Sequence, residues 1–141
     1  MQEAGVPASV SIAMAVIESN WGESVLARDY HNLFAIRGKG PAGSVYMRDE
    51  EGQPTEPGGS TAYRKYNNNA ESVADHARLF ASSKQYEAAM SHKDRPDNFA
   101  HALSGLYSPL PNYGTTLQRI MKQFDLYRFD RVRLEKAPDD E

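Results

Sequence analysis

An apolar stripe at helical spacing is the first clear pattern along the chain. It predicts a helix over residues 6–21, with Pro7 in its first turn and Gly22 at its end. Residues 4–17 carry no ionisable side chain, so we expect this helix to be covered on most of its faces. The stripe consists of Val10, Ala13, Met14, Ile17 and Trp21.

The next part of the chain is rich in glycine and proline, which favours turns over a long helix. Residues 32–36 are a short apolar segment that we expect to be irregular or weakly extended. Residues 44–48 and 61–66 combine partial alternation with aromatic side chains, a pattern typical of strands. We therefore predict a β-hairpin with a long acidic loop between its strands.

Helical periodicity returns after the asparagines at 67–69 and continues towards the end of the chain. Three stripes predict three further helical regions, whereas the charged tail at 131–141 lacks periodicity and is expected to be frayed. The predicted fold class is α+β, mainly helical, with one domain over residues 1–130. The stripes are Val73, Ala77 and Phe80; Phe99, Leu103 and Leu106; and Leu117, Ile120, Met121 and Phe124.

Composition and charge remove several classes of function. The net charge of -3 and the absence of a dense Lys/Arg run argue against nucleic acid. The uncharged stretch at 4–17 is too short to span a bilayer, and no basic residue precedes it as in a signal peptide. There is no cysteine, and the four histidines show no ligand spacing, so we expect no metal and no cofactor.

Glu18 is the first candidate for chemistry, because it is a lone acid at the end of an uncharged helix. Limited access of water would raise the pKa of its carboxyl group, as a general acid requires at neutral pH. The alternative is a boundary residue at the edge of the apolar arc. Glycoside cleavage usually takes a second carboxylate. The acidic loop offers Asp49, Glu50 and Glu51, which on pattern alone read as a solvated loop, and Asp75 and Asp94 follow later.

Aromatic residues are the second clue, because sugar rings stack their C–H faces on flat side chains. On pattern alone, Trp21 and Phe34 favour packing over binding. Tyr107 and Tyr113 flank two prolines in a predicted loop, where a core stripe explains a tyrosine less easily. The other aromatic candidates near glycines or polar residues are Tyr30, Tyr63 and Tyr66.

Five ordered segments of the chain resemble the glucosaminidase family. Residues 15–24 read Ala-Val-Ile-Glu-Ser-Asn-Trp-Gly-Glu-Ser and residues 32–38 read Asn-Leu-Phe-Ala-Ile-Arg-Gly. The usual family forms are Leu-Glu-Ser-Gly-Trp-Gly and Asn-Leu-Phe-Gly-Ile-Lys-Gly. Residues 62–66 are similar to its Phe-Arg-Lys-Tyr strand, 72–76 to its Ser-x-x-Asp-His helix, and 105–113 to its Gly-Tyr-Ala-Thr-Asp-Pro-x-Tyr loop.

The resemblance implies a lysozyme-like helical lobe, a small β-hairpin lobe and a glycan groove. The implied activity is hydrolysis of the β-1,4 bond from N-acetylglucosamine to N-acetylmuramic acid in peptidoglycan, with Glu18 as general acid and Tyr107 as site tyrosine. An acid of the hairpin is the second carboxylate, Asp49 being narrowly preferred to Glu50. The resemblance allows two mechanisms, one in which this acid acts as the base and one in which the acetamido group of the substrate assists. The implied substrate-binding residues are Trp21, Asn32, Phe34, Tyr66, Glu50 and Tyr113.

Two departures from the family pattern concern the backbone near the site. Ala35 replaces the usual glycine, and Ser108-Pro109-Leu110 replaces Ala-Thr-Asp beside Tyr107.

The alternatives to a peptidoglycan hydrolase are a non-catalytic peptidoglycan-binding module, a lytic transglycosylase and a plain helical interaction domain. For an enzyme of this kind we expect action in the cell wall or periplasm, as a monomer, on peptidoglycan strands, without membrane insertion.

Overall fold

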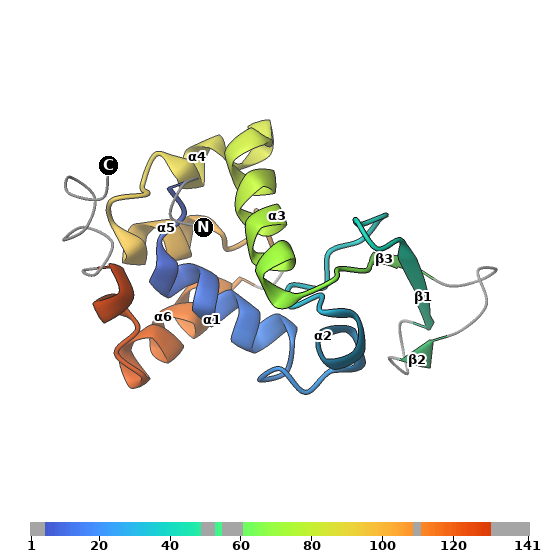
Figure 1. Cartoon of the computed structure of the whole chain (residues 1–141). Coiled ribbons are helices and arrows are strands. Elements are labelled where there is room, and N and C mark those ends of the chain that lie inside the picture. Colours follow the sequence, from blue (N-terminus) through green and yellow to red (C-terminus); the bar gives the residue numbers. More distant parts are fainter. Residues whose placement is uncertain (1–4, 49–52, 55–60, 109–110, 131–141) are drawn as a thin grey trace, which may run out of the picture. The chain divides into compact units, whose positions relative to one another are not determined.

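The computed structural model describes residues 5–48, 53–54, 61–108 and 111–130 (Figure 1). The chain divides into two compact units. We call residues 15–76 the sheet unit, and residues 1–14 together with 77–141 the helical unit. The predicted tail at 131–141 lies outside the described residues, and the single domain predicted over residues 1–130 stays a prediction.

Helix α1, Ala8–Glu18, is the uncharged helix that the sequence predicts. Val10, Ala13 and Met14 are fully buried, in agreement with the apolar stripe. The backbone N–H of Ser9, in the first turn, donates to the Oδ1 atom of Asp130, 3.0 Å away. A carboxylate 121 positions later in the chain therefore caps the positive end of α1. The predicted C-terminal end was wrong, because the helix ends at Glu18 and not at Trp21.

The sheet unit contains a three-stranded antiparallel sheet in the order β2-β1-β3 (Figure 1). β1, Ser44–Arg48, pairs with β3, Thr61–Arg64, with Val45 opposite Tyr63. This pairing confirms the two strands of the predicted hairpin. The sequence missed β2, Gln53–Pro54, which pairs with the other edge of β1 and is too short to show a period. Beyond β3, Arg37 forms an isolated antiparallel bridge to Tyr63.

The segment at 32–36 is irregular, as predicted, and Ala35 explains why. Its φ of 55° lies in the left-handed region that glycine occupies at low cost. Glycine, which the family pattern has at this position, would adopt this φ at low cost, whereas the alanine side chain adds local strain.

The helical unit is built from short helices around aromatic and aliphatic side chains. The predicted core residues Phe80, Phe99, Leu103, Leu117 and Met121 are all buried. Its elements are the part of α3, Asn69–Ser82, from residue 77 on; η1, Lys84–Tyr86; α4, Glu87–Met90; α5, Pro96–Ala102; α6, Tyr113–Gln123; and the helical residues 127–130.

Phe124, the last member of the predicted stripes, is not a core residue. Phe124 follows the end of α6 and is 41% exposed. Helical periodicity overestimated the length of the stripe by one residue, because the helix ends before Phe124. The mainly helical α+β class is nevertheless confirmed. Among the described residues no helix is both long enough and apolar enough to cross a membrane.

Gly114 permits the close approach of α5 and α6. A Cβ atom at this position would lie 2.6 Å from the Cα atom of His101 and 2.7 Å from the carbonyl oxygen of Ala100. Both contacts are with backbone, which cannot rotate away. We predict that Gly114→Ala lowers the free energy of unfolding by about 2 to 3 kcal/mol, although glycine to alanine in a helix is otherwise stabilising.

Urea unfolding of the Gly114 variant, followed by circular dichroism, measures this effect. Thr115→Ala, at an exposed position on the same helix, is the matched control and should change stability by less than about 0.5 kcal/mol. Equal stability of Gly114→Ala and wild type would show that the two helices do not require this close approach.

Candidate active site

Glu18 occupies the last position of α1 and is partly buried. The next residue, Ser19, is 3% exposed and its hydroxyl serves the turn. Its Oγ atom donates to the carbonyl oxygen of Ala15 at 2.5 Å and accepts from the N–H of Gly22 at 2.8 Å. Because both sides of the turn bond to one buried hydroxyl, the backbone that follows Glu18 is held in place.

Trp21 lies in this turn in an unusual backbone conformation. Asn20, Trp21 and Gly22 have φ values of 51°, 59° and 81°, so three consecutive residues are left-handed. The N–H of Trp21 donates to the carbonyl oxygen of Val16 at 2.9 Å, which closes the end of the helix. The tryptophan side chain is 58% exposed, so the interpretation of Trp21 as a packing residue was wrong.

Helix α2, Val25–Tyr30, continues the chain from this turn. The hydroxyl of Ser24 caps it by accepting from the N–H of Ala27 at 3.1 Å. Asn32 follows the helix and is 1% exposed. Its amide nitrogen donates to the carbonyl oxygens of Ile36 and Arg64, both at 2.9 Å, and its Oδ1 atom accepts from the N–H of Ile36 at 3.0 Å. Asn32 thus joins the irregular segment to the end of β3.

Asp75, on α3, is the centre of a polar network. Its Oδ2 atom accepts from the guanidinium of Arg64 at 2.7 Å and from the hydroxyl of Tyr66 at 2.5 Å. Tyr66 is 3% exposed. Burial, followed by its hydrogen bond to Asp75, raises the pKa of the Tyr66 phenol, so this group stays a proton donor. Asp75 was a candidate second carboxylate, but the structure shows it engaged by two side-chain donors, Arg64 and Tyr66.

Phe34 and His76 form a buried stack beside this network. Their ring centroids are 3.7 Å apart with an angle of 10° between the planes, and both side chains are 2% exposed. Burial lowers the pKa of His76 to about 3, so the imidazole is neutral at physiological pH. Three residues of the predicted substrate-binding set, Asn32, Phe34 and Tyr66, are therefore interior in this structure.

The two tyrosines of the helical unit that were predicted as site residues belong to an aromatic cluster. Tyr107 is partly exposed and its ring centroid lies 5.7 Å from that of Phe80 and 5.8 Å from that of Tyr113. Tyr113 is the first residue of α6 and is 3% exposed, so packing accounts for it. Tyr107 follows Gly105, whose φ of 77° and N–H bond to the carbonyl oxygen of Ser108 form a tight turn.

Of the remaining acidic candidates, three lie outside the described residues and one is exposed. Asp49, Glu50 and Glu51 lie outside the described residues, directly after β1. Asp94 is exposed. Within the described part of the chain, no group of three or more His, Cys, Asp or Glu side chains is arranged to hold a metal ion.

Sequence reasoning missed the supporting role of the Arg64, Tyr66 and Asp75 side chains. Arg64 and Tyr66 are two positions apart on an extended segment, which places them on one face. That alternation was a usable signal for a shared partner. The identity of the partner was not predictable, because Asp75 lies on a separate helix and competes with other acids in the sequence.

Comparison with known proteins identifies the family. The model of the glucosaminidase family, described as mannosyl-glycoprotein endo-beta-N-acetylglucosaminidase, matches residues 1–126. The chain belongs to the glucosaminidase family. The match covers the turn at Glu18, the sheet unit and the Tyr107 segment, which are the regions that carry the resemblance in the sequence.

Curated relatives support the same assignment. This glucosaminidase-family chain is 31% identical over 134 residues to exo-glucosaminidase LytG of Bacillus subtilis (strain 168), covering 88% of the chain and 46% of the relative. It is 36% identical over 136 residues to a probable N-acetylmuramidase of Lactococcus lactis subsp. lactis (strain IL1403), covering 89% and 30%. The chain thus spans less than half of either relative.

Solved structures of the family share the fold. The catalytic domain of the autolysin Auto from Listeria monocytogenes matches with a TM-score of 0.75 at 26% identity, over 91% of this chain and 77% of that one. An N-acetylmuramoyl-L-alanine amidase structure from Staphylococcus aureus matches with a TM-score of 0.75 at 31% identity, over 92% and 38%.

The buried neutral His76 predicts an acid-sensitive stability for this glucosaminidase-family chain. An unfolded histidine has a pKa near 6.5, so below that pH the unfolded state takes up the proton first. The contribution of His76 to the free energy of unfolding is fully present above about pH 6.5 and is lost as the pH falls towards 3. We expect a loss of about 2 kcal/mol between pH 7 and pH 5 from His76.

Urea unfolding at several pH values tests this by comparing wild type with His76→Phe, which keeps a ring on Phe34. The variant should lose that part of the pH dependence. His101→Phe, at an exposed position, is the control and should retain it. The same pH slope in wild type and His76→Phe would contradict the prediction.

Proposed function

We propose that this chain is a peptidoglycan hydrolase that cleaves the β-1,4 bond from N-acetylglucosamine to N-acetylmuramic acid. Family membership and relatives named exo-glucosaminidase and autolysin support a glycosidase of the bacterial cell wall. The observation that carries the proposal is the rigid turn that presents a partly buried carboxyl group, Glu18, three residues from an exposed indole, Trp21.

Glu18 is the proposed general acid. Its place at the C-terminal end of α1 exposes it to the negative end of the helix dipole, and partial burial limits its hydration. Both effects favour the protonated carboxyl group over the carboxylate. In the reaction, Glu18 gives its proton to the glycosidic oxygen as the bond to the anomeric carbon breaks, and the leaving sugar departs as an alcohol.

A second carboxylate completes the proposed chemistry, and Asp49 is preferred narrowly to Glu50. Both residues directly follow β1, in the acidic segment that the resemblance places at the hairpin. As a general base this acid takes a proton from water while the water oxygen bonds to the anomeric carbon. Asp75 is not proposed for this role, because its carboxylate already accepts from Arg64 and Tyr66.

Trp21 is the proposed sugar platform of the sheet unit. A flat, exposed side chain on a strained and hydrogen-bonded turn is held ready to stack on a pyranose ring. Asn32, Phe34 and Tyr66 then support the turn and the sheet rather than contact the glycan. Tyr107 is proposed as a further site residue, since it is the partly exposed member of its cluster and matches the family tyrosine.

The same proposal sets the partner and the place of action. The substrate is the glycan strand of peptidoglycan, which lies in the cell wall and, in some bacteria, in the periplasm. The reaction needs no cofactor and no metal, because proton transfer between carboxyl groups and water is sufficient. We propose that the chain acts as a monomer.

We predict that Glu18→Gln lowers turnover of purified peptidoglycan by at least about a thousandfold, because the amide cannot supply the proton. Mass spectrometry of the digest identifies the bond. Wild type should release products with reducing N-acetylglucosamine ends, and the variant should release none. Circular dichroism of the variant should match wild type.

Control variants and alternative products make this test decisive. Glu23→Gln changes an exposed carboxylate in the same turn and should leave turnover unchanged, while Asp49→Asn should reduce it less than Glu18→Gln. Reducing N-acetylmuramic acid ends would identify a muramidase, the activity named for one relative. Anhydromuramic ends would identify a transglycosylase. Full turnover by Glu18→Gln would remove Glu18 as the acid.

We predict that Trp21→Ala raises KM for solubilised glycan strands about three- to tenfold, because it removes a stacking surface. Trp21→Phe should restore part of the affinity, and kcat should change less than KM. The control is Phe124→Ala, which removes another exposed aromatic side chain, in the helical unit. An unchanged KM for Trp21→Ala would exclude the platform.

A further inference from the structure

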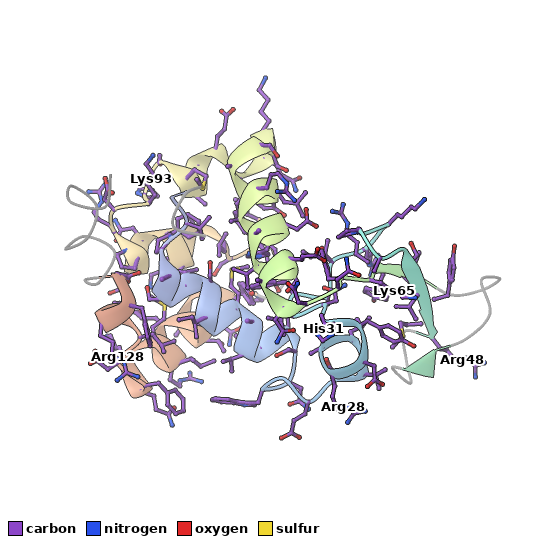
Figure 2. All side chains as sticks on the ribbon, in the orientation of Figure 1. Arg28, His31, Arg48, Lys65, Lys93 and Arg128 are labelled. Atoms are coloured by element: carbon purple, nitrogen blue, oxygen red, sulfur yellow. The ribbon has the colours of Figure 1, made fainter. Side chains whose placement is uncertain are left out.

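Two basic side chains of the sheet unit are each held over a tyrosine ring. The guanidinium carbon of Arg37 lies 6.0 Å from the ring centroid of Tyr63. The Nζ atom of Lys65, the residue labelled beside the strands in Figure 2, lies 5.7 Å from the ring centroid of Tyr30. Each distance is within the range of cation–π attraction, which orients a cation without neutralising its charge.

The backbone brings these two pairs together on one face of the sheet unit. Arg37 bridges Tyr63 antiparallel, and Lys65 lies two positions after Tyr63. Arg64 and Tyr66 both donate to the same Oδ2 atom of Asp75, so they share the opposite face of this extended segment. Tyr63 and Lys65 therefore point away from Asp75, and the N–H bond of Tyr66 to the carbonyl oxygen of Tyr30 keeps Tyr30 close.

The charges of Arg37 and Lys65 remain available. Neither side chain takes part in an ion pair within the described residues, whereas Arg64 is paired with Asp75 and Arg28 lies 3.6 Å from Asp29. Glu71, another acid of the unit, accepts from the backbone N–H of Asn67. Asp29, Asp75 and Glu71 thus have other partners, and among the residues that the structure describes neither cation of this face has an ion-pair partner.

We infer that Arg37 and Lys65 bind carboxylate groups of the peptide stems on the glycan strand, so that the enzyme prefers peptide-bearing to peptide-free glycan. This inference rests on the proposed function. A glycan that carries stems presents carboxylates at intervals, and two oriented cations complement that charge. Stem carboxylates are chosen over other anionic wall polymers because they are attached to the strand that the sheet unit, with Glu18, is proposed to act on.

The test uses the double variant Arg37→Gln/Lys65→Gln and two preparations of one teichoic-acid-free peptidoglycan, solubilised with its stems or after amidase removal of them. KM for the stem-bearing glycan should rise about three- to tenfold, with kcat unchanged and with KM for stem-free glycan unchanged. Wild type should lose its preference for stem-bearing glycan in 0.5 M salt, and the double variant should show little salt dependence.

A matched control and a binding assay separate the outcomes. Lys84→Gln/Lys122→Gln removes the same charge from exposed positions of the helical unit and should leave both KM values unchanged. Three results for the double variant would overturn the inference: an equal rise in KM on both glycans, no rise in KM on either, or a rise in KM seen only with wall material that retains teichoic acid. If wild type proves inactive on both glycans, the proposed function fails, and cosedimentation of wild type and the double variant with each glycan still decides stem recognition.

Discussion

The paired hydrogen bonds on Asp75 are the interaction on which the rest of the sheet unit depends. One carboxylate oxygen accepts from Arg64 and Tyr66, which directs both side chains of the extended segment to the same side. Because side chains alternate along a strand, Tyr63 and Lys65 are then directed to the other side. A partly buried charge pair of this kind is costly unless every group is bonded, and here Arg64 also donates its Nε hydrogen to the carbonyl oxygen of Arg37.

The same network links the motif segments of the glucosaminidase family to one another. Asn32 bonds to the carbonyl oxygens of Ile36 and Arg64, and Phe34 stacks on His76, the neighbour of Asp75. The family pattern in this region therefore describes a supporting structure more than a surface. Its neutral histidine has a physical consequence, since a buried uncharged imidazole favours a fold that is most stable above acidic pH.

The turn after Glu18 combines local strain with full hydrogen bonding. The left-handed conformations of Asn20 and Trp21 are unfavourable, whereas Gly22 adopts its conformation at low cost. Ser19 offsets the cost by bonding to both sides of the turn. The result is an exposed tryptophan and a helix-terminal carboxyl group on a backbone with little freedom. Such pre-organisation suits a site that has to hold a stiff polysaccharide, because less ordering is needed when the substrate binds.

Sequence patterns alone identified most of the longer elements and the candidate acid, but not α2, β2, η1 or α4. Periodicity located α1, α3, α5 and α6, alternation located β1 and β3, and the lack of any other charge in the first helix singled out Glu18, because these signals depend only on spacing along the chain. The tertiary structure alone decided that Trp21 is exposed while Asn32, Phe34 and Tyr66 are interior, and that Asp130 caps α1. The burial of a side chain and its hydrogen-bond partners depend on contacts between residues far apart in the sequence, and the spacing of residues along one segment does not encode those contacts.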